Sequence, residues 1–157
     1  MIGSALKKFA QQNGLTMDKG VAYGSLSGIA VTLSEGGGWK QIVFSTRFAD
    51  PARRTAVSDA LAARDLKEEF RVTKYDVNSK RIQVMFQDKR DIMDRMQVFL
   101  NWFLPLLRAN GASGAEYCAQ CGQLITGGKW VLLNGNAYHF HPQCAERVRQ
   151  DMETKKQ

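Results

Sequence analysis

The sequence predicts an α+β fold, in which helices pack on an antiparallel sheet and a small metal-binding module follows. Apolar residues recur at helical spacing in three segments and alternate with polar residues in the segments between them. Glycines and polar turn residues separate the alternating segments by short intervals, which is typical of antiparallel hairpins. All three cysteines lie between residues 118 and 144, where they form a metal-binding pattern with a histidine.

The composition is that of an ordinary folded protein. The 157 residues are 44% hydrophobic and 24% charged, which suits one domain with a small appendage and argues against disorder. No apolar run reaches the ~18 residues of a membrane-spanning helix, and the N-terminus lacks the features of a signal peptide. An odd number of clustered cysteines favours metal binding in a reducing compartment. We therefore expect a cytoplasmic protein.

The first third of the chain predicts one helix and three antiparallel strands. Residues 3–14 form the helix, because their apolar side chains fall on one face opposite two lysines. That face carries Ala5, Leu6, Phe9 and Ala10. Residues 21–35 and 39–48 alternate apolar and polar side chains on either side of a glycine run, which predicts extended segments joined by turns.

The middle of the chain predicts a second helix and a hairpin. Residues 50–66 begin with Asp50 as the helix N-cap and Pro51 at the first helical position. Residues 70–86 alternate again around a polar Asn-Ser turn, with Phe70 in the first of two strands.

Residues 88–111 predict a third helix, which is the most apolar element. Its apolar side chains surround nearly the whole helix, which is more apolar area than one sheet face needs. Either both sides are buried, between the sheet and the metal module, or one side binds a second copy of the chain or another protein. The residues of this candidate interaction surface are Phe99, Trp102, Phe103, Leu106 and Leu107.

The predicted order of elements is α-β-β-β-α-β-β-α over residues 1–110, followed by a Gly/Ser linker at 111–116 and the metal module at 117–157. Over residues 3–108 this order resembles the type III secretion chaperone-like fold, a group of bacterial proteins and domains that bind other polypeptides and often dimerise. The resemblance implies a bacterial protein with a polypeptide-binding surface.

Four residues near the C-terminus have the spacing of a zinc site. They are Cys118, Cys121, His141 and Cys144, in the pattern C-x2-C-x19-H-x2-C. Residues 129–140 predict two strands around an Asn-Gly turn, and Pro142 is placed to begin a helix that carries the last ligand in its first turn. The hairpin brings both ends of the motif together, and we expect one structural Zn²⁺ per chain.

This segment resembles the first zinc module of a LIM domain, in the treble-clef group. In that resemblance Cys118 and Cys121 match the knuckle cysteines, and His141 and Cys144 match the closing pair. The resemblance implies zinc binding and a protein-interaction role, although the sequence contains one such module where a LIM domain has two. His139 is the alternative ligand, because it projects to the same face as His141 if the strand continues that far. We favour His141 for its spacing to Cys144, with His139 packed beside the site.

The net charge of +7 lies mainly outside the metal motif, because residues 1–111 hold 17 Lys and Arg against 11 Asp and Glu. A phosphate-binding patch and ordinary solvated charge are both interpretations of one group of residues. That group is Arg47, Phe48, Arg53, Arg54, Lys80 and Arg81.

The sequence shows no catalytic constellation. Four protein ligands close a zinc site, no carboxylate lies between residues 118 and 144, and residues 1–111 contain no histidine. We therefore expect a zinc-containing protein-interaction or scaffold protein without catalytic activity, whose partner is another protein or a second copy of the chain. Nucleic-acid binding by the basic N-terminal region is the alternative. A membrane partner is expected only through a segment outside this sequence.

Overall fold

A computed structural model describes residues 4–125, 127–133 and 135–155 of the chain. Its centre is a six-stranded antiparallel sheet in the order β1-β2-β3-β4-β6-β5. The strands are β1 (Thr16–Asp18), β2 (Val21–Leu26), β3 (Ile29–Gly36), β4 (Trp39–Ser45), β5 (Val72–Val77) and β6 (Ile82–Gln87). Strand β6 pairs with both β4 and β5, so the hairpin β5–β6 extends the sheet formed by the first four strands.

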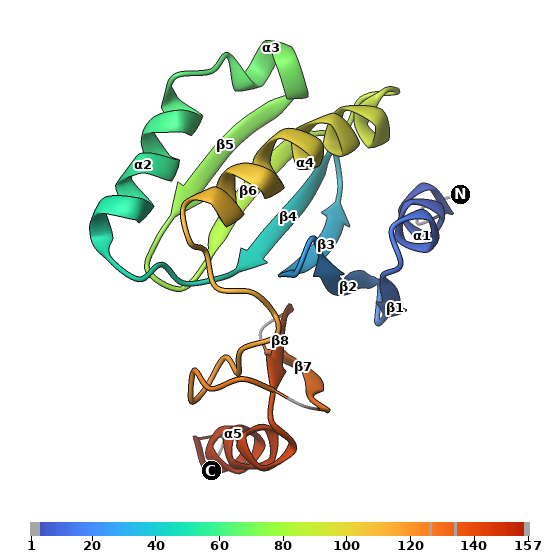
Figure 1. The fold of residues 1–157 in the computed structure, drawn as a ribbon. Helices are drawn as coiled ribbons and strands as arrows, with labels where there is room; N and C mark the ends of the chain where they lie inside the picture. Colours follow the sequence, from blue (N-terminus) through green and yellow to red (C-terminus); the bar gives the residue numbers. More distant parts are fainter. Residues whose placement is uncertain (1–3, 126, 134, 156–157) are drawn as a thin grey trace.

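Helices cover one face of this sheet (Figure 1). They are α1 (Ser4–Gln12), α2 (Pro51–Ala62), α3 (Leu66–Phe70) and α4 (Ile92–Ala109). Alternate residues of β3 and β4, such as Val31 and Phe44, point to this face and are fully buried against Phe99 and Phe103 of α4. The sequence-based prediction of an α+β fold is therefore confirmed.

The structure corrects several details of the first predicted elements. In α1, Leu6, Phe9 and Ala10 are buried as expected, but Ala5 is exposed. Strand β1 was not expected, because it has only three residues and no apolar alternation. It forms by pairing with β2 across a tight turn in which Lys19 and Gly20 have positive φ angles.

The start of the second hairpin also differs from the prediction. Asp50 caps α2 through the amide of Arg53, as expected. Phe70, however, ends the short helix α3 instead of beginning a strand. This helix is capped by Asp65, which accepts a hydrogen bond from the amide of Glu68 at 3.2 Å.

Helix α4 buries most of the residues that we expected at an interaction surface. Phe99, Phe103 and Leu107 are fully buried in the core, whereas Trp102 and Leu106 are half-buried. Packing within the chain thus explains why Phe99, Phe103 and Leu107 are apolar, and their burial needs no partner protein. A partner contact at Trp102 or Leu106 stays a prediction.

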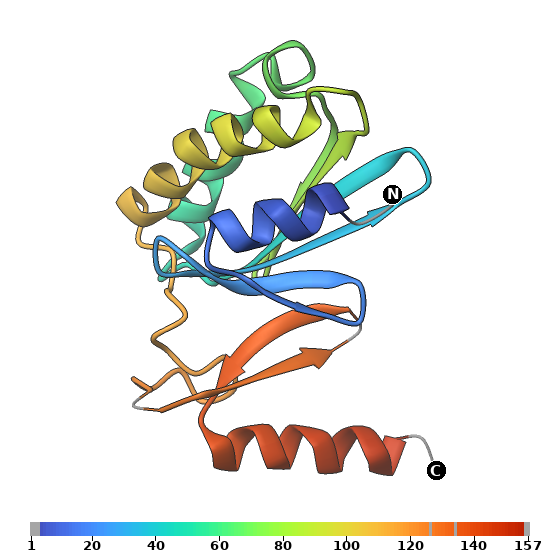
Figure 2. The ribbon, with the colours of Figure 1, turned by 90° about the vertical axis from the view of Figure 1, so that its right-hand side faces the viewer.

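The half-buried ring of Trp102 also has intramolecular neighbours. Phe70 stacks on it with ring centroids 5.8 Å apart, and the guanidinium of Arg64 lies 4.5 Å from the ring centroid. The metal module does not cover this helix, because the module lies on the opposite face of the sheet (Figure 2). Within the described residues, no helix is long and apolar enough to cross a membrane.

The C-terminal module consists of β7 (Lys129–Leu133), β8 (Asn136–Phe140) and α5 (Pro142–Lys155). The two strands form a hairpin, followed by the predicted helix. The predicted Asn-Gly turn includes residue 134, which lies outside the described residues. Strand β8 packs on the outer faces of β3 and β4, and α5 lies beyond the hairpin (Figure 2).

The segment predicted as a linker is bound to the sheet. Thr46 Oγ1 donates to the carbonyl of Ser113 at 2.8 Å, and the backbone of Arg47 exchanges two hydrogen bonds with Ser113. The amide of Ala115 donates to the carbonyl of Gly28, and its side chain is buried. This packing fixes the direction in which the chain enters the metal module.

We expect Leu107→Ala to lower the free energy of unfolding by about 2–5 kcal/mol, because it opens a cavity beneath a fully buried side chain. The neighbouring Leu106→Ala is the matched control and should cost about 1 kcal/mol or less, since Leu106 is only half-buried. Urea unfolding followed by circular dichroism measures both values. Equal losses would show that Leu107 is not a core residue.

Candidate metal centre

The structure brings Cys118, Cys121, His141 and Cys144 together in one group. Their four donor atoms all lie within 4.8 Å of one another. A tetrahedral zinc ion with Zn–S bonds of ~2.3 Å holds its sulfur ligands about 3.8 Å apart. The donors therefore need to close by about 1 Å at most, and the group fits a single four-coordinate metal site.

A tight turn presents the first two cysteines. The amide of Cys118 donates to the carbonyl of Gln123 at 2.9 Å, and the amide of Gly122 donates to the carbonyl of Cys118 at the same distance. Gly122 has a φ of +77°, a conformation that glycine adopts without steric strain. The turn also directs the amide of Gln120 at the Cys118 sulfur, 3.4 Å away.

The hairpin and the last helix supply the other two ligands. His141 directly follows β8, and its amide lies 3.5 Å from the Cys118 sulfur. Cys144 lies in the first turn of α5, behind Pro142. Ligands from the two ends of the motif therefore meet because β7 and β8 reverse the chain direction.

A hydrogen bond orients the imidazole of His141. Its Nε2–H donates to the carbonyl of Leu124 at 2.9 Å, and its Nδ1 lies 3.3 Å from the sulfur of Cys121. A metal-bound histidine commonly donates its second ring nitrogen to a carbonyl in this way. The observed orientation thus presents Nδ1 as the metal-binding atom.

His139 lies outside this group and has a different set of contacts. Its Nδ1 donates to the carbonyl of Ala115 at 2.6 Å, and its ring stacks on Trp130 with centroids 4.6 Å apart. The structure therefore places His141, and not His139, among the four clustered donors. His139 instead connects the hairpin to the segment that enters the module.

The thiols of Cys118 and Cys144 have strongly different pKa values. Burial raises the pKa of Cys118, but the amides of Cys121, His141 and Gln120 outweigh burial and lower this pKa to about 6. Burial and the neighbouring sulfurs raise the pKa of Cys144 to about 11. One thiolate is therefore stable by itself, whereas several thiolates together require a cation between them.

The four protein donors favour a structural metal site over a catalytic one. Four protein ligands complete a tetrahedral coordination sphere and leave no position for a reactive water. Of the two acidic residues that flank the motif, Glu116 and Glu146, the first pairs with Arg108 at 3.5 Å. The arrangement is therefore that of a structural metal site.

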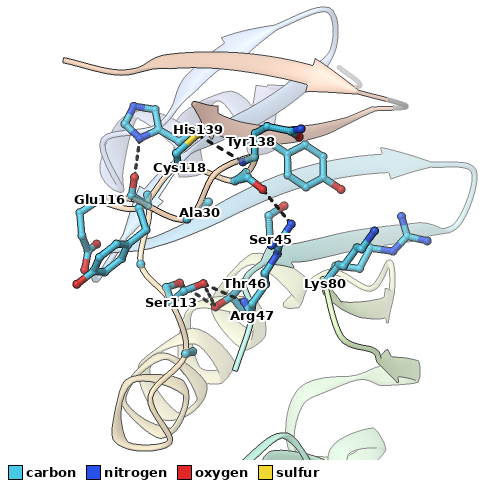
Figure 3. A pocket seen from close by; sticks show the side chains of 18 of the residues that line it. Ala30, Ser45, Thr46, Arg47, Lys80, Ser113, Glu116, Cys118, Tyr138 and His139 are labelled. Carbon is cyan, nitrogen blue, oxygen red and sulfur yellow. Dashed lines mark hydrogen bonds between the residues drawn. The ribbon is translucent and has the colours of Figure 1, made fainter. Parts of the chain in front are cut away.

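Sequence reasoning did not find the cleft that forms where the module meets the sheet. Its volume is about 790 Å³, and its walls include Arg47, Phe48, Lys80, Arg81 and Arg108. Figure 3 shows Arg47 and Lys80 among the side chains that line it. Four of these five residues belong to the group for which the sequence left a phosphate-binding patch and ordinary solvated charge both open, whereas Arg53 and Arg54 do not line the cleft. That Arg108 also lines the cleft is evident only from the position of the module in the structure.

Comparisons of the chain with protein-family models, curated proteins and solved structures found no match. The assignment of a metal site therefore rests on the convergence of the four donors. The LIM-like and chaperone-like resemblances rest on the pattern of the sequence.

We expect the purified chain to hold one zinc ion and His141→Gln to weaken its retention strongly, because the variant removes one of four donors. The matched control His139→Gln should keep the ion, since this ring contacts Ala115 and Trp130 instead. Elemental analysis after dialysis against a weak chelator compares the two. Loss of metal from the His139 variant alone would reverse the ligand assignment.

Proposed function

We propose that this chain is a zinc-containing protein-interaction protein, in which a structural zinc ion holds the C-terminal module in its docked form. The observation that carries the proposal is the convergence of three cysteines and one histidine on one point. Sulfur and imidazole ligands in this number are those of structural zinc sites. Three free thiols in one site favour a reducing compartment, such as the cytoplasm.

The position of the metal site supports a role in holding a binding surface in place. The turn that carries Cys118 and Cys121 is bound to the sheet, because Arg47 Nη2 donates to the carbonyl of Ala119 at 2.9 Å. The ion would thus hold one wall of the cleft described above, and the sheet forms the other wall. Both resemblances found in the sequence imply polypeptide binding, which agrees with a binding role for this junction.

Nucleic-acid binding is the second candidate, because the cleft gathers several cationic side chains in a chain of net charge +7. The two functions differ in what the protein retains from an extract of its source cells. We expect the zinc-loaded chain to retain specific proteins after nuclease treatment, and Cys144→Ser to retain fewer. Loss of all retained proteins on nuclease treatment would favour nucleic acid instead.

We expect a zinc chelator to remove hydrogen-exchange protection from residues 116–145 while β3, β4 and β6 stay protected. The reason is that the module has only a small buried cluster of its own, centred on Val131 and Phe140, whereas the sheet has a large apolar core. Exchange measured by mass spectrometry with and without chelator tests this. Simultaneous loss of protection in β5 and β6 would show that the ion stabilises the whole chain.

A further inference from the structure

We propose that the cleft between the metal module and the sheet binds an acidic, apolar-containing peptide segment of a protein partner. This inference rests on the proposed function and names the surface and the chemistry of the partner. The cleft has a volume of about 790 Å³, within the range of sites that enclose a small ligand or a few residues of a peptide.

The charge of the cleft selects an anionic partner. The described residues that line it include Arg47, Lys80, Arg81 and Arg108, whereas Glu116 is the sole carboxylate among them. Arg108 pairs with Glu116 at 3.5 Å, and both side chains are about two-fifths exposed, so an incoming carboxylate can compete for this arginine. The local excess of positive charge is therefore available to a ligand.

Two of the cations are held at the cleft without acidic partners. Lys80 and Arg81 lie in the β5–β6 turn, in which Asn78 Oδ1 accepts hydrogen bonds from both of their amides at 2.9 and 3.0 Å. Within the described residues, neither side chain forms an ion pair. A fixed backbone with unpaired charges is suited to binding an anion from outside the chain.

The cations are spread along the cleft instead of meeting at one point. Figure 3 shows Lys80 on one side, Glu116 and His139 on the other, and Arg47 with Ser113 between them. A single phosphate or carboxylate would reach only part of this set. The arrangement matches a ligand with several negative charges along its length.

The remaining wall is apolar and favours a peptide over a nucleic acid. Phe48, Leu133, Tyr138 and Val148 line the cleft and are half-buried, so part of each side chain is open to a ligand. Single-stranded nucleic acids bind mainly by stacking bases on aromatic rings, whereas Leu133 and Val148 are aliphatic and offer no ring. Aliphatic or aromatic side chains of a peptide can pack against such a wall.

The test uses the full zinc-loaded chain and a fluorescein-labelled peptide of about twelve residues, rich in glutamate with a central phenylalanine. We expect binding by fluorescence anisotropy, and about tenfold weaker binding by the double variant Lys80→Glu, Arg81→Glu. The matched control is Lys89→Glu, Arg90→Glu, an exposed basic pair of the same type that lies outside this cleft. The control should bind the peptide within about twofold of the unchanged chain.

Each other result overturns the proposal. These results are no binding of the peptide, equal weakening by both double variants, and tighter binding of an oligothymidylate of equal charge that is lost in the Lys80/Arg81 variant. The last result would assign the cleft to nucleic acid. If the chain retains proteins after nuclease treatment and the Lys80/Arg81 variant retains them equally well, the proposed function stands and this inference alone fails.

Discussion

Two hydrogen bonds at a single buried residue, Ala137, set the position of the metal module. Its amide donates to Thr32 Oγ1 at 2.7 Å, and its carbonyl accepts from Ser45 Oγ at 3.1 Å. Ala137 is fully buried, so each backbone group would cost about 1–3 kcal/mol if it lost its partner. This pair defines how β8 lies on β3 and β4, and thereby where the metal ligands and the cleft form.

The metal site and the docking contacts constrain the same short segment from opposite sides. The turn that carries Cys118 and Cys121 supplies two of the four clustered donors, while Arg47, just after β4, donates to the carbonyl of Ala119. His139 then binds the carbonyl of Ala115, just before the knuckle. Because these contacts follow one another along the chain, a metal ion bound by the four donors would order the same segment that contacts near the sheet already hold.

Sequence patterns that span only a few residues were sufficient to predict the features that depend on neighbouring residues. The ligand spacing predicted the four clustered donors, and Asp50 with Pro51 predicted the start of α2. Contacts between distant parts of the chain were not predictable in this way. Thr32 alternates with apolar residues, a pattern that predicts a solvent-facing side chain. Its hydrogen-bond partner Ala137, however, lies 105 residues away in the sequence. The cleft depends on that contact, so its full set of walls could not be read from the sequence.

The outer face of the sheet has a consequence for a chain whose module detaches. Beneath the hairpin, this face presents small and hydroxyl-bearing side chains, such as Ala30, Thr32 and Ser45, but also Val43 and the ring of Tyr23, which contacts Trp130 of the hairpin. Detachment of the module would expose these apolar groups on the sheet and on the hairpin alike. Whatever holds the module docked therefore also shields the chain from unwanted association with other proteins.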